Sequence, residues 1–166
     1  MRKVDYRSLD LSESVVSVSR VSKATRGGRK SSFRVYVLTG NKSGCVGYAS
    51  ATHSEVLEAK NKAIRRARNS MYRFSLKDNR TVHHDLLSKF GASKIYLKPA
   101  SPGTGIVAGG AAREFFEMVG VSDVIAKSYG SSNVDLIVRN MFKAFSSIYP
   151  PRYIANKRGK QIADLT

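Results

Sequence analysis

The sequence has a single cysteine, Cys45, and only three histidines among 166 residues. A lone thiol excludes an internal disulfide, and no set of cysteines and histidines has the spacing of a zinc site. We therefore expect a reducing compartment and no metal. Cys45 stands beside Val46 in a predicted strand, where a small buried side chain is the usual occupant.

Long apolar runs are missing as well, and none approaches the ~20 residues that a membrane-spanning helix needs. The N-terminus has no apolar signal core, and Asp5, Asp10 and Glu13 oppose the acid-poor composition of an organellar presequence. These absences predict a cytoplasmic protein with no membrane partner. An organellar protein whose presequence has been cleaved fits the same residues.

Acidic side chains are scarce: 12 Asp and Glu stand against 29 Lys and Arg, which gives a net charge of +17. A folded surface with such a charge attracts polyanions. Residues 1–75 hold 16 of the basic side chains and 5 of the acidic ones. We therefore expect a polyanion partner that the N-terminal half binds more strongly.

Residues suited to catalysis are few. The densest cluster, His83-His84-Asp85, lies on an expected extended segment, where neighbouring side chains point to opposite faces and make a poor metal pair. A glycine-rich run at 103–110, G-x-G-x-x-x-G-G, precedes a predicted helix but misses the dinucleotide fingerprint by one residue and lacks Gly-Lys-Ser/Thr. The sequence thus predicts no enzyme, no cofactor and no small-molecule substrate.

The first half has the pattern of a sheet followed by a helix. Residues 15–23 and 33–38, rich in β-branched side chains or alternating in polarity, flank a glycine turn and predict a hairpin. A third strand is expected at 45–51. Apolar residues at helical spacing then predict a helix from 55 to about 72, with Ser54 as its N-cap.

The second half alternates strands and helices. A polar connector at 73–93 with one short strand leads to expected strands at 94–100 and 124–130. Between them lies a helix that Gly120 caps, and a last helix ends before two prolines at 150–151. We predict an α+β fold class divided into residues 1–75, residues 80–150 and a basic C-terminal arm at 151–166.

The basic side chains are arranged in a way that favours nucleic acid. Six of them and no acid lie between Arg20 and Arg34, around a turn whose glycines allow close backbone approach. More follow on one side of the predicted helix. Such a surface suits RNA recognised by its backbone and shape, and the expected binding residues are Arg20, Lys23, Arg26, Gly27, Gly28, Arg29, Lys30, Arg34, Arg65, Arg66 and Arg68.

A family resemblance rests on six blocks that follow one another in this order: SRVSKATRGGRKSSF, GCVGYASA, SEVLEAKNKAIRRARNSM, KPASPGTGIVAGGAAREFFEMVGV, VIAKSYGSSN and ANKRG. Any one block would be unspecific, whereas six in register along nearly the whole chain from about Leu11 are not. In these blocks the sequence resembles the bacterial and organellar form of small-subunit ribosomal protein five.

The resemblance implies a fold and a role. The N-terminal domain would be similar to the double-stranded-RNA-binding fold, and the C-terminal α/β domain would contain a left-handed βαβ crossover, against the general right-handed rule. Members of this family are structural constituents of the small ribosomal subunit, on cytoplasmic or organellar ribosomes. They bind small-subunit ribosomal RNA, stabilise the subunit, lie where mRNA enters it and contribute to decoding accuracy.

Single residues carry over from the family by position. Residues 25–30 match the hairpin loop that in the family reaches ribosomal RNA near the subunit neck, beside the spectinomycin site. Gly103, Gly105 and Arg113 match a loop and helix that face small-subunit ribosomal protein four at an interface that affects accuracy, and ribosomal protein eight is a second expected neighbour. The family's third strand is richer in glycine and carries a lysine, where this sequence has Ala49, Ser50, Ala51 and Thr52.

Two competing interpretations use the same residues. The family's C-terminal fold is shared with small-molecule kinases and other nucleotide-handling proteins, so the glycine run would then be a nucleotide site. A free RNA chaperone or double-stranded-RNA-binding regulator would carry the same basic surface away from the ribosome.

Overall fold

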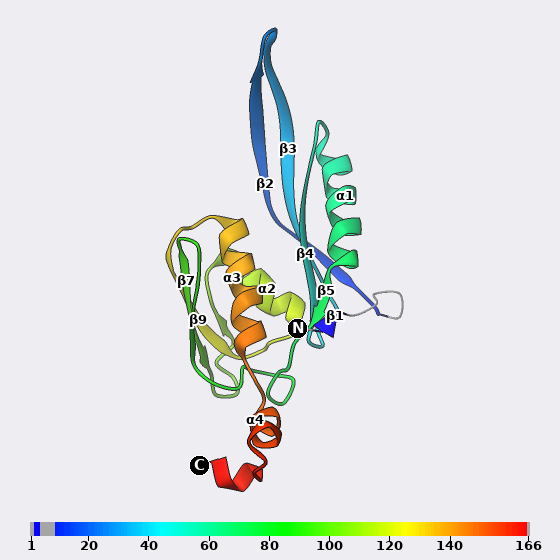
Figure 1. The fold of residues 1–166 in the computed structure, drawn as a ribbon. Coiled ribbons are helices and arrows are strands. Elements are labelled where there is room, and N and C mark those ends of the chain that lie inside the picture. Colours follow the sequence, from blue (N-terminus) through cyan, green and yellow to red (C-terminus); the bar gives the residue numbers. More distant parts are fainter. Residues whose placement is uncertain (1, 4–8, 166) are drawn as a thin grey trace.

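The structure, a computed structural model, describes residues 2–3 and 9–165, so Asp5 and the other residues at 1, 4–8 and 166 lie outside the described part. A long hairpin stands away from the body of the molecule, and the C-terminal helix lies at the opposite end (Figure 1). The elements in chain order are β1 (Arg2–Lys3), β2 (Ser12–Thr25), β3 (Gly28–Gly40), β4 (Cys45–His53), α1 (Val56–Asn69), β5 (Met71–Arg73), β6 (Leu86–Phe90), β7 (Ser93–Pro99), β8 (Ile106–Val107), α2 (Gly110–Val119), β9 (Val124–Gly130), α3 (Val134–Ser147), α4 (Pro151–Arg158) and the 3-10 helix η2 (Ile162–Leu165).

The first sheet has the order β1-β5-β4-β3-β2, and all of its pairs are antiparallel. One face is covered by α1, where Val35, Val37 and Ala51 of the sheet are buried against small helix residues. Close packing depends on Gly47, because a Cβ there would overlap the carbonyl oxygen of Ala67. The predicted three strands and helix are therefore present, with β1 and β5 added at one edge.

The ends of α1 differ from the prediction. The helix ends at Asn69. Met71 instead belongs to β5, where it pairs with Gly47 of β4 and its side chain is fully buried. Ser54 is not the N-cap, since the helix begins after Glu55 and no side chain caps it. The Glu55 N–H instead donates to Nδ1 of His53 at 3.3 Å. Both differences come from partners in β4 that helical periodicity alone does not reveal.

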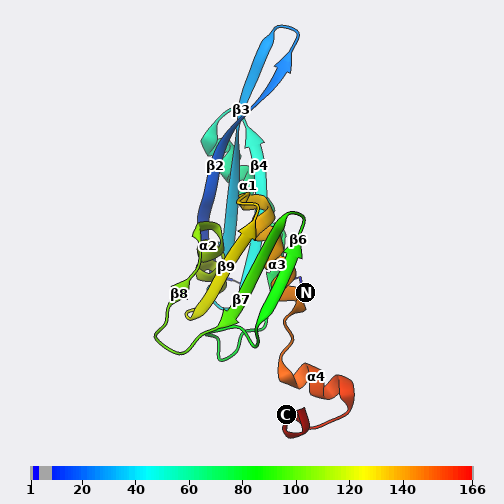
Figure 2. The ribbon, with the colours of Figure 1, turned by 90° about the vertical axis from the view of Figure 1, so that its left-hand side faces the viewer.

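The second sheet has the order β6-β7-β9-β8, in which only β8 and β9 are parallel. In Figure 2 this sheet faces the viewer, with α2 and α3 behind it. The chain runs from β8 through α2 to β9, and β9 lies to the right of β8 in this view. Both strands point upward in this view, so the crossover is left-handed. The fold class inferred from the family resemblance is confirmed.

Three elements of the second half refine the prediction. The connector contains β6, which pairs along its whole length with β7. The glycine-rich run contains β8, expected as loop but paired with Val124 and Ile125 of β9. The C-terminal arm is helical over Pro151–Arg158, with proline at the first helical position, where its missing N–H costs no hydrogen bond.

A single hydrophobic core joins the two sheets. Leu38 and Val46 of the first sheet belong to the same buried cluster as Phe115 and Phe116 of α2 and Ile95 of β7. Within the described residues, no helix is long and apolar enough to cross a membrane. The predicted domain boundary at residues 75–80 stays a prediction, because one buried cluster contains residues from both sides of it.

Candidate nucleic-acid interface

The β2–β3 hairpin is buried where it joins the body of the molecule and exposed at its tip. Thr25 pairs with Gly28, so only Arg26 and Gly27 form the turn, and the Thr25 hydroxyl donates to the Gly28 carbonyl at 3.0 Å. Gly28 has φ +130°, a conformation that other residues rarely adopt. Residues 22–30 are all exposed. The turn thus presents the predicted basic residues on a bare, well-hydrogen-bonded ribbon.

Strand alternation sorts the hairpin cations onto two faces. Lys23 lies directly opposite Lys30, and Arg34 follows on the same face four residues after Lys30. Arg20 and Arg29 share the other face, where the Arg20 guanidinium donates to the Ser31 hydroxyl at 3.1 Å. Directly opposed like charges destabilise a sheet. The Lys23–Lys30 pair is therefore a place where an outside anion relieves repulsion.

The three arginines predicted on α1 differ in their surroundings. Arg68 donates to Glu13 at 2.7 Å and is neutralised by it. Arg66 donates to the Ser50 carbonyl at 3.3 Å, and Arg65 is exposed with no ion pair among the described residues. The helix therefore offers fewer free charges than its sequence suggests.

A basic pocket of about 450 Å³ lies at the base of the hairpin. Its floor is formed by Arg34 of β3 and by Ser50 and Thr52 of β4, beyond the point at which β5 stops pairing with β4. Lys62 and Arg66 of α1 form one side, and Asp135 and Arg139 of α3 the other. The charged residues that line this basic pocket are Arg34, Lys62, Arg66, Arg139 and Asp135.

The carboxylate in the basic pocket is already used inside the fold. Asp135 accepts hydrogen bonds from the Tyr48 hydroxyl at 2.7 Å and from Nε of Arg139 at 3.0 Å. Burial, and then the hydrogen bond to Asp135, raise the pKa of Tyr48, so its hydroxyl stays a donor at neutral pH. This chain of contacts fixes the start of α3 against the first sheet.

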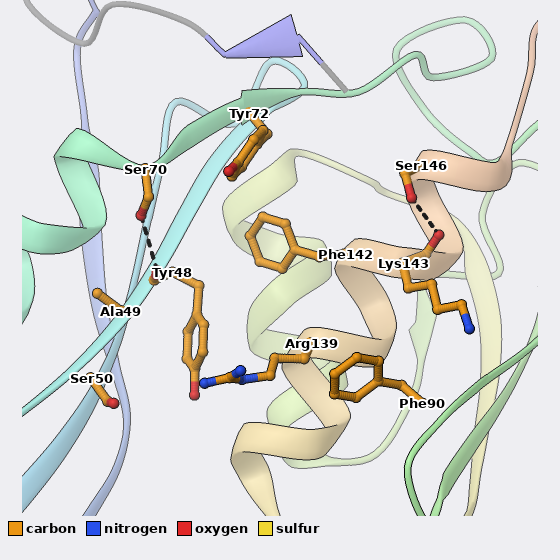
Figure 3. A pocket seen from close by; sticks show the side chains of 10 residues that line it. All are labelled: Tyr48, Ala49, Ser50, Ser70, Tyr72, Phe90, Arg139, Phe142, Lys143 and Ser146. Atoms are coloured by element: carbon orange, nitrogen blue, oxygen red, sulfur yellow. Dashed lines mark hydrogen bonds between the residues drawn. The ribbon is translucent and has the colours of Figure 1, made fainter.

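An aromatic hollow of about 650 Å³ adjoins the basic pocket and shares Ser50 and Arg139 with it. Figure 3 shows its aromatic side chains facing one another between the first sheet and α3, with the Arg139 guanidinium beside the Tyr48 ring. Phe142 contacts Tyr72 edge to face with ring centroids 6.0 Å apart. The hollow therefore opens along the contact between the two halves of the molecule.

The glycine-rich loop is organised around a carboxylate of the protein itself. Asp123, only 5% exposed, accepts the Gly105 N–H at 2.9 Å and the Arg80 guanidinium at 2.8 Å. The Arg80 hydrogen bond, and then the Gly105 N–H, lower the pKa of Asp123 and keep it anionic. A phosphate would meet this negative charge. The loop geometry therefore does not support the nucleotide-site interpretation.

Arg113 lies beside the same loop. It is exposed on α2, and its guanidinium donates to the Ile106 carbonyl at 2.9 Å, so it holds β8 in place. Gly103 and Gly105 have φ of +88° and +74°, and a Cβ on either would meet no neighbour within 4 Å. Of the three residues predicted to face a protein partner, Gly103 and Arg113 are thus exposed and Gly105 is half-buried, and both glycines serve the backbone conformation.

The candidate catalytic groups do not assemble. His83 contacts the Ser75 hydroxyl at 3.1 Å, and burial lowers its pKa, while His84 contacts the carbonyl of Asp85. Cys45 is buried as predicted, and burial raises the pKa of its thiol. Across residues 2–3 and 9–165, no three His, Cys, Asp or Glu side chains gather as a metal site.

Two basic surfaces were not identified as sites from the sequence. Lys62 and Arg139 enter the basic pocket from helices that are distant in the chain, and no local pattern reveals this. The register of the second sheet places exposed lysines and Tyr129 on one face, opposite the buried Ile95 and Leu97, and here the alternation within KIYLKPA gave a usable signal. Those lysines are Lys89, Lys94, Lys98 and Lys127.

Comparison with known proteins identifies both halves. Residues 11–75 match the N-terminal domain of ribosomal protein S5, and residues 88–158 match its C-terminal domain. The chain is 60% identical over 161 residues to the small ribosomal subunit protein uS5 of Neorickettsia sennetsu, covering 97% of this chain and 94% of that protein.

Further relatives agree over similar lengths. The uS5 proteins of Anaplasma phagocytophilum and Ehrlichia canis are each 49% identical over 156 residues, which covers 94% of this chain and 90% of each relative. These matches confirm the resemblance drawn from the six sequence blocks and the prediction that the chain is not an enzyme. The chain belongs to the ribosomal protein S5 family, a family of structural proteins of the small ribosomal subunit.

Proposed function

We propose that the chain binds small-subunit ribosomal RNA chiefly through the β2–β3 hairpin. The observation that carries the proposal is the Lys23–Lys30 pair, two cations directly opposed on an exposed ribbon. No acid lies between Arg20 and Arg34 to balance them. Phosphates of RNA supply that balance and release counterions as they bind.

The helix α1 contributes less to RNA binding in this proposal. Arg65 is free to contact phosphate and Arg66 retains unused N–H donors, whereas the charge of Arg68 is neutralised by Glu13. The exposed Gly27 and Gly28 let the turn approach the RNA backbone without a side chain between them. The hairpin therefore sets the orientation of the protein on the RNA, and α1 adds affinity.

The glycine-rich loop has a separate role in the proposal. Gly103, Gly105 and Arg113 lie on a loop and the helix after it that, by the family resemblance, contact ribosomal protein four and influence decoding accuracy. Ribosomal protein eight and mRNA where it enters the subunit are the other proposed neighbours. The setting is the ribosome of a bacterial cytoplasm, as for the bacterial relatives. An interface that changes as the subunit closes biases that closure by its strength.

The RNA proposal is tested by fractionating a cell lysate on a sucrose gradient and crosslinking hairpin residues to RNA. The protein is expected in the small subunit, with crosslinks from residues 23–30 to ribosomal RNA. A double substitution, Lys23→Gln with Lys30→Gln, is expected to shift the protein out of the subunit at moderate salt. The matched control, Lys98→Gln with Lys127→Gln, removes the same charge from the second sheet.

Two results contradict the RNA proposal. Protein at the top of the gradient and free of ribosomal RNA would support an RNA chaperone or regulator acting away from the ribosome. Equal loss from both double variants would show that only total charge matters and that the hairpin has no special role.

The accuracy proposal is tested with Arg113→Leu. The substitution removes the hydrogen bond to Ile106 and one exposed cation, so the interface with ribosomal protein four is weakened and the closed subunit is favoured. Misreading in a stop-codon reporter is expected to rise several-fold. Unchanged misreading with normal subunit assembly would overturn the assignment, and Glu117→Gln, exposed on the same helix, serves as the control.

A further inference from the structure

The basic pocket has an excess of positive charge that the fold does not balance. It contains four cations and one carboxylate, and that carboxylate already accepts from Tyr48 and Arg139. Arg34, Lys62 and Arg66 form no ion pair within the described residues. Like charges around one cavity repel unless an anion lies between them. The charge of the pocket therefore favours a negative partner from outside the chain.

Hydrogen-bond donors in the pocket are also available. Arg34 uses only Nε, on the Thr52 hydroxyl at 3.4 Å, and Arg66 uses one terminal nitrogen on the Ser50 carbonyl. Arg139 uses Nε on Asp135. Each guanidinium thus keeps at least one unused terminal N–H₂, the group that binds phosphate oxygens in a forked arrangement. Lys62 adds an ammonium with three donors.

The pocket is continuous with the basic face of the hairpin. Lys23, Lys30 and Arg34 alternate along the same face of β2 and β3, and Arg34 forms part of the pocket floor. A chain of phosphates that contacts the Lys23–Lys30 pair can therefore continue down the ribbon to the pocket. At about 450 Å³, the pocket has room for a phosphate with its attached sugar.

We propose that the basic pocket binds a backbone phosphate of ribosomal RNA, held between β3, α1 and α3. The inference rests on the proposed RNA-binding function and extends it to a second contact at the junction of the two halves. Lys62 and Arg139, which come from different halves of the chain, grip the same phosphate group. Bound RNA would therefore add a further link between α3 and the first sheet, beside the Tyr48–Asp135 hydrogen bond.

Lys62 and Lys60 provide a matched pair for the test. Both are exposed lysines on α1, but only Lys62 lines the pocket, and a separation of two residues places them on opposite sides of the helix. Each is replaced by cysteine and labelled with a short photo-crosslinker in assembled small subunits. Cys45 is 3% exposed, so within this chain labelling is confined to the introduced cysteine.

The expected result is a crosslink from position 62 to ribosomal RNA at one site, mapped by primer extension, and none at that site from position 60. A crosslink from position 62 to a ribosomal protein, or equal RNA crosslinks from both positions, would overturn the pocket. A cysteine at Ser22 on the hairpin separates the two proposals. If it crosslinks to RNA while position 62 does not, only the pocket fails, and if neither does, RNA binding by the hairpin fails too.

Salt dependence supplies a second readout. The Lys62→Gln variant is expected to lower the slope of log affinity for ribosomal RNA against log salt by about 1, and Lys60→Gln to leave it unchanged. Free nucleotides are the other source of phosphate, so AMP is titrated against the full-length protein. Saturable AMP binding that Lys62→Gln abolishes, with no change of the RNA slope, would overturn the assignment to RNA.

Discussion

At the hairpin tip, a Cβ added to Gly27 or Gly28 would meet no atom within 4 Å, whereas a Cβ on Gly40 or Gly120 would overlap backbone from the other half of the molecule. Glycine therefore has a different role at the hairpin tip and between the two halves. At the tip, glycine leaves space for something outside the chain. Between the halves, it removes a side chain so that two parts of the chain can touch.

The crowded region, called the seam here, is the contact between residues 40–44 and the end of α2. The Lys42 N–H donates to the Met118 carbonyl at 3.2 Å, and the Gly44 N–H donates to the Val119 carbonyl at 2.7 Å. These bonds satisfy carbonyls at the C-terminus of the helix that would otherwise lack partners. The seam is thus fixed by the backbone itself, while the tip is fixed only by its own two strands.

The largest effect is expected from Gly120→Ala. Gly120 caps α2 with φ +92°, and a Cβ there would overlap the carbonyl of Lys42. Left-handed strain and overpacking together are expected to lower the free energy of unfolding by about 3–5 kcal/mol. Urea unfolding followed by circular dichroism measures it.

Gly27→Ala is the matched control for the seam substitution. The added methyl group meets open solvent, so the free energy of unfolding is expected to change by less than about 1 kcal/mol. If Gly27→Ala and Gly120→Ala lowered the free energy of unfolding by similar amounts, the close contact at Gly120 would not be the cause of the loss.

A smaller effect is expected from Tyr48→Phe, which removes a hydrogen bond across the same junction. The Tyr48 hydroxyl donates to Asp135 at 2.7 Å, and without it a partly buried carboxylate loses one of its two donors. The free energy of unfolding should fall by about 1–2 kcal/mol. Tyr36→Phe is the control, because its ring stacks on Tyr48 but its hydroxyl has no partner among the described residues. A fall of equal size in the control would show that the loss does not come from the Tyr48–Asp135 hydrogen bond, since both variants keep their rings and only one breaks that bond.

The difference between the tip and the seam also explains which features could be predicted from the sequence and which could not. The hairpin follows from local alternation and a glycine turn, so its strands, its turn and its cations were found from neighbouring residues alone. Met71 was placed in the helix, because its pairing with Gly47 lies outside any local window. The crowding at Gly40 and Gly120 has the same origin, since a glycine at a close contact between distant segments looks like any turn glycine.

The candidate sites divide along the same line. The proposed RNA-binding residues from Arg20 to Arg34 lie within one stretch of sequence, so charge counting was enough to propose them. The basic pocket joins β3, β4, α1 and α3, so Lys62 and Arg139 became neighbours only in the folded chain. Arg68 shows the reverse case, because its position on a basic helix face gave no sign of the ion pair with Glu13. The left-handed crossover came from the family resemblance and not from general rules.

The smallest effect on stability is expected at the tip, and with the opposite sign. Replacing Lys23 and Lys30 by glutamine removes a repulsive cross-strand pair, so the free energy of unfolding should rise by up to about 0.5 kcal/mol. The gain should be present at low salt and vanish near 1 M, where screening acts within about 3 Å. The same double variant is expected to lose RNA binding. A variant that folds better and binds worse would show that the charges at the tip serve the partner, and a loss of stability at every salt concentration would show that they serve the fold.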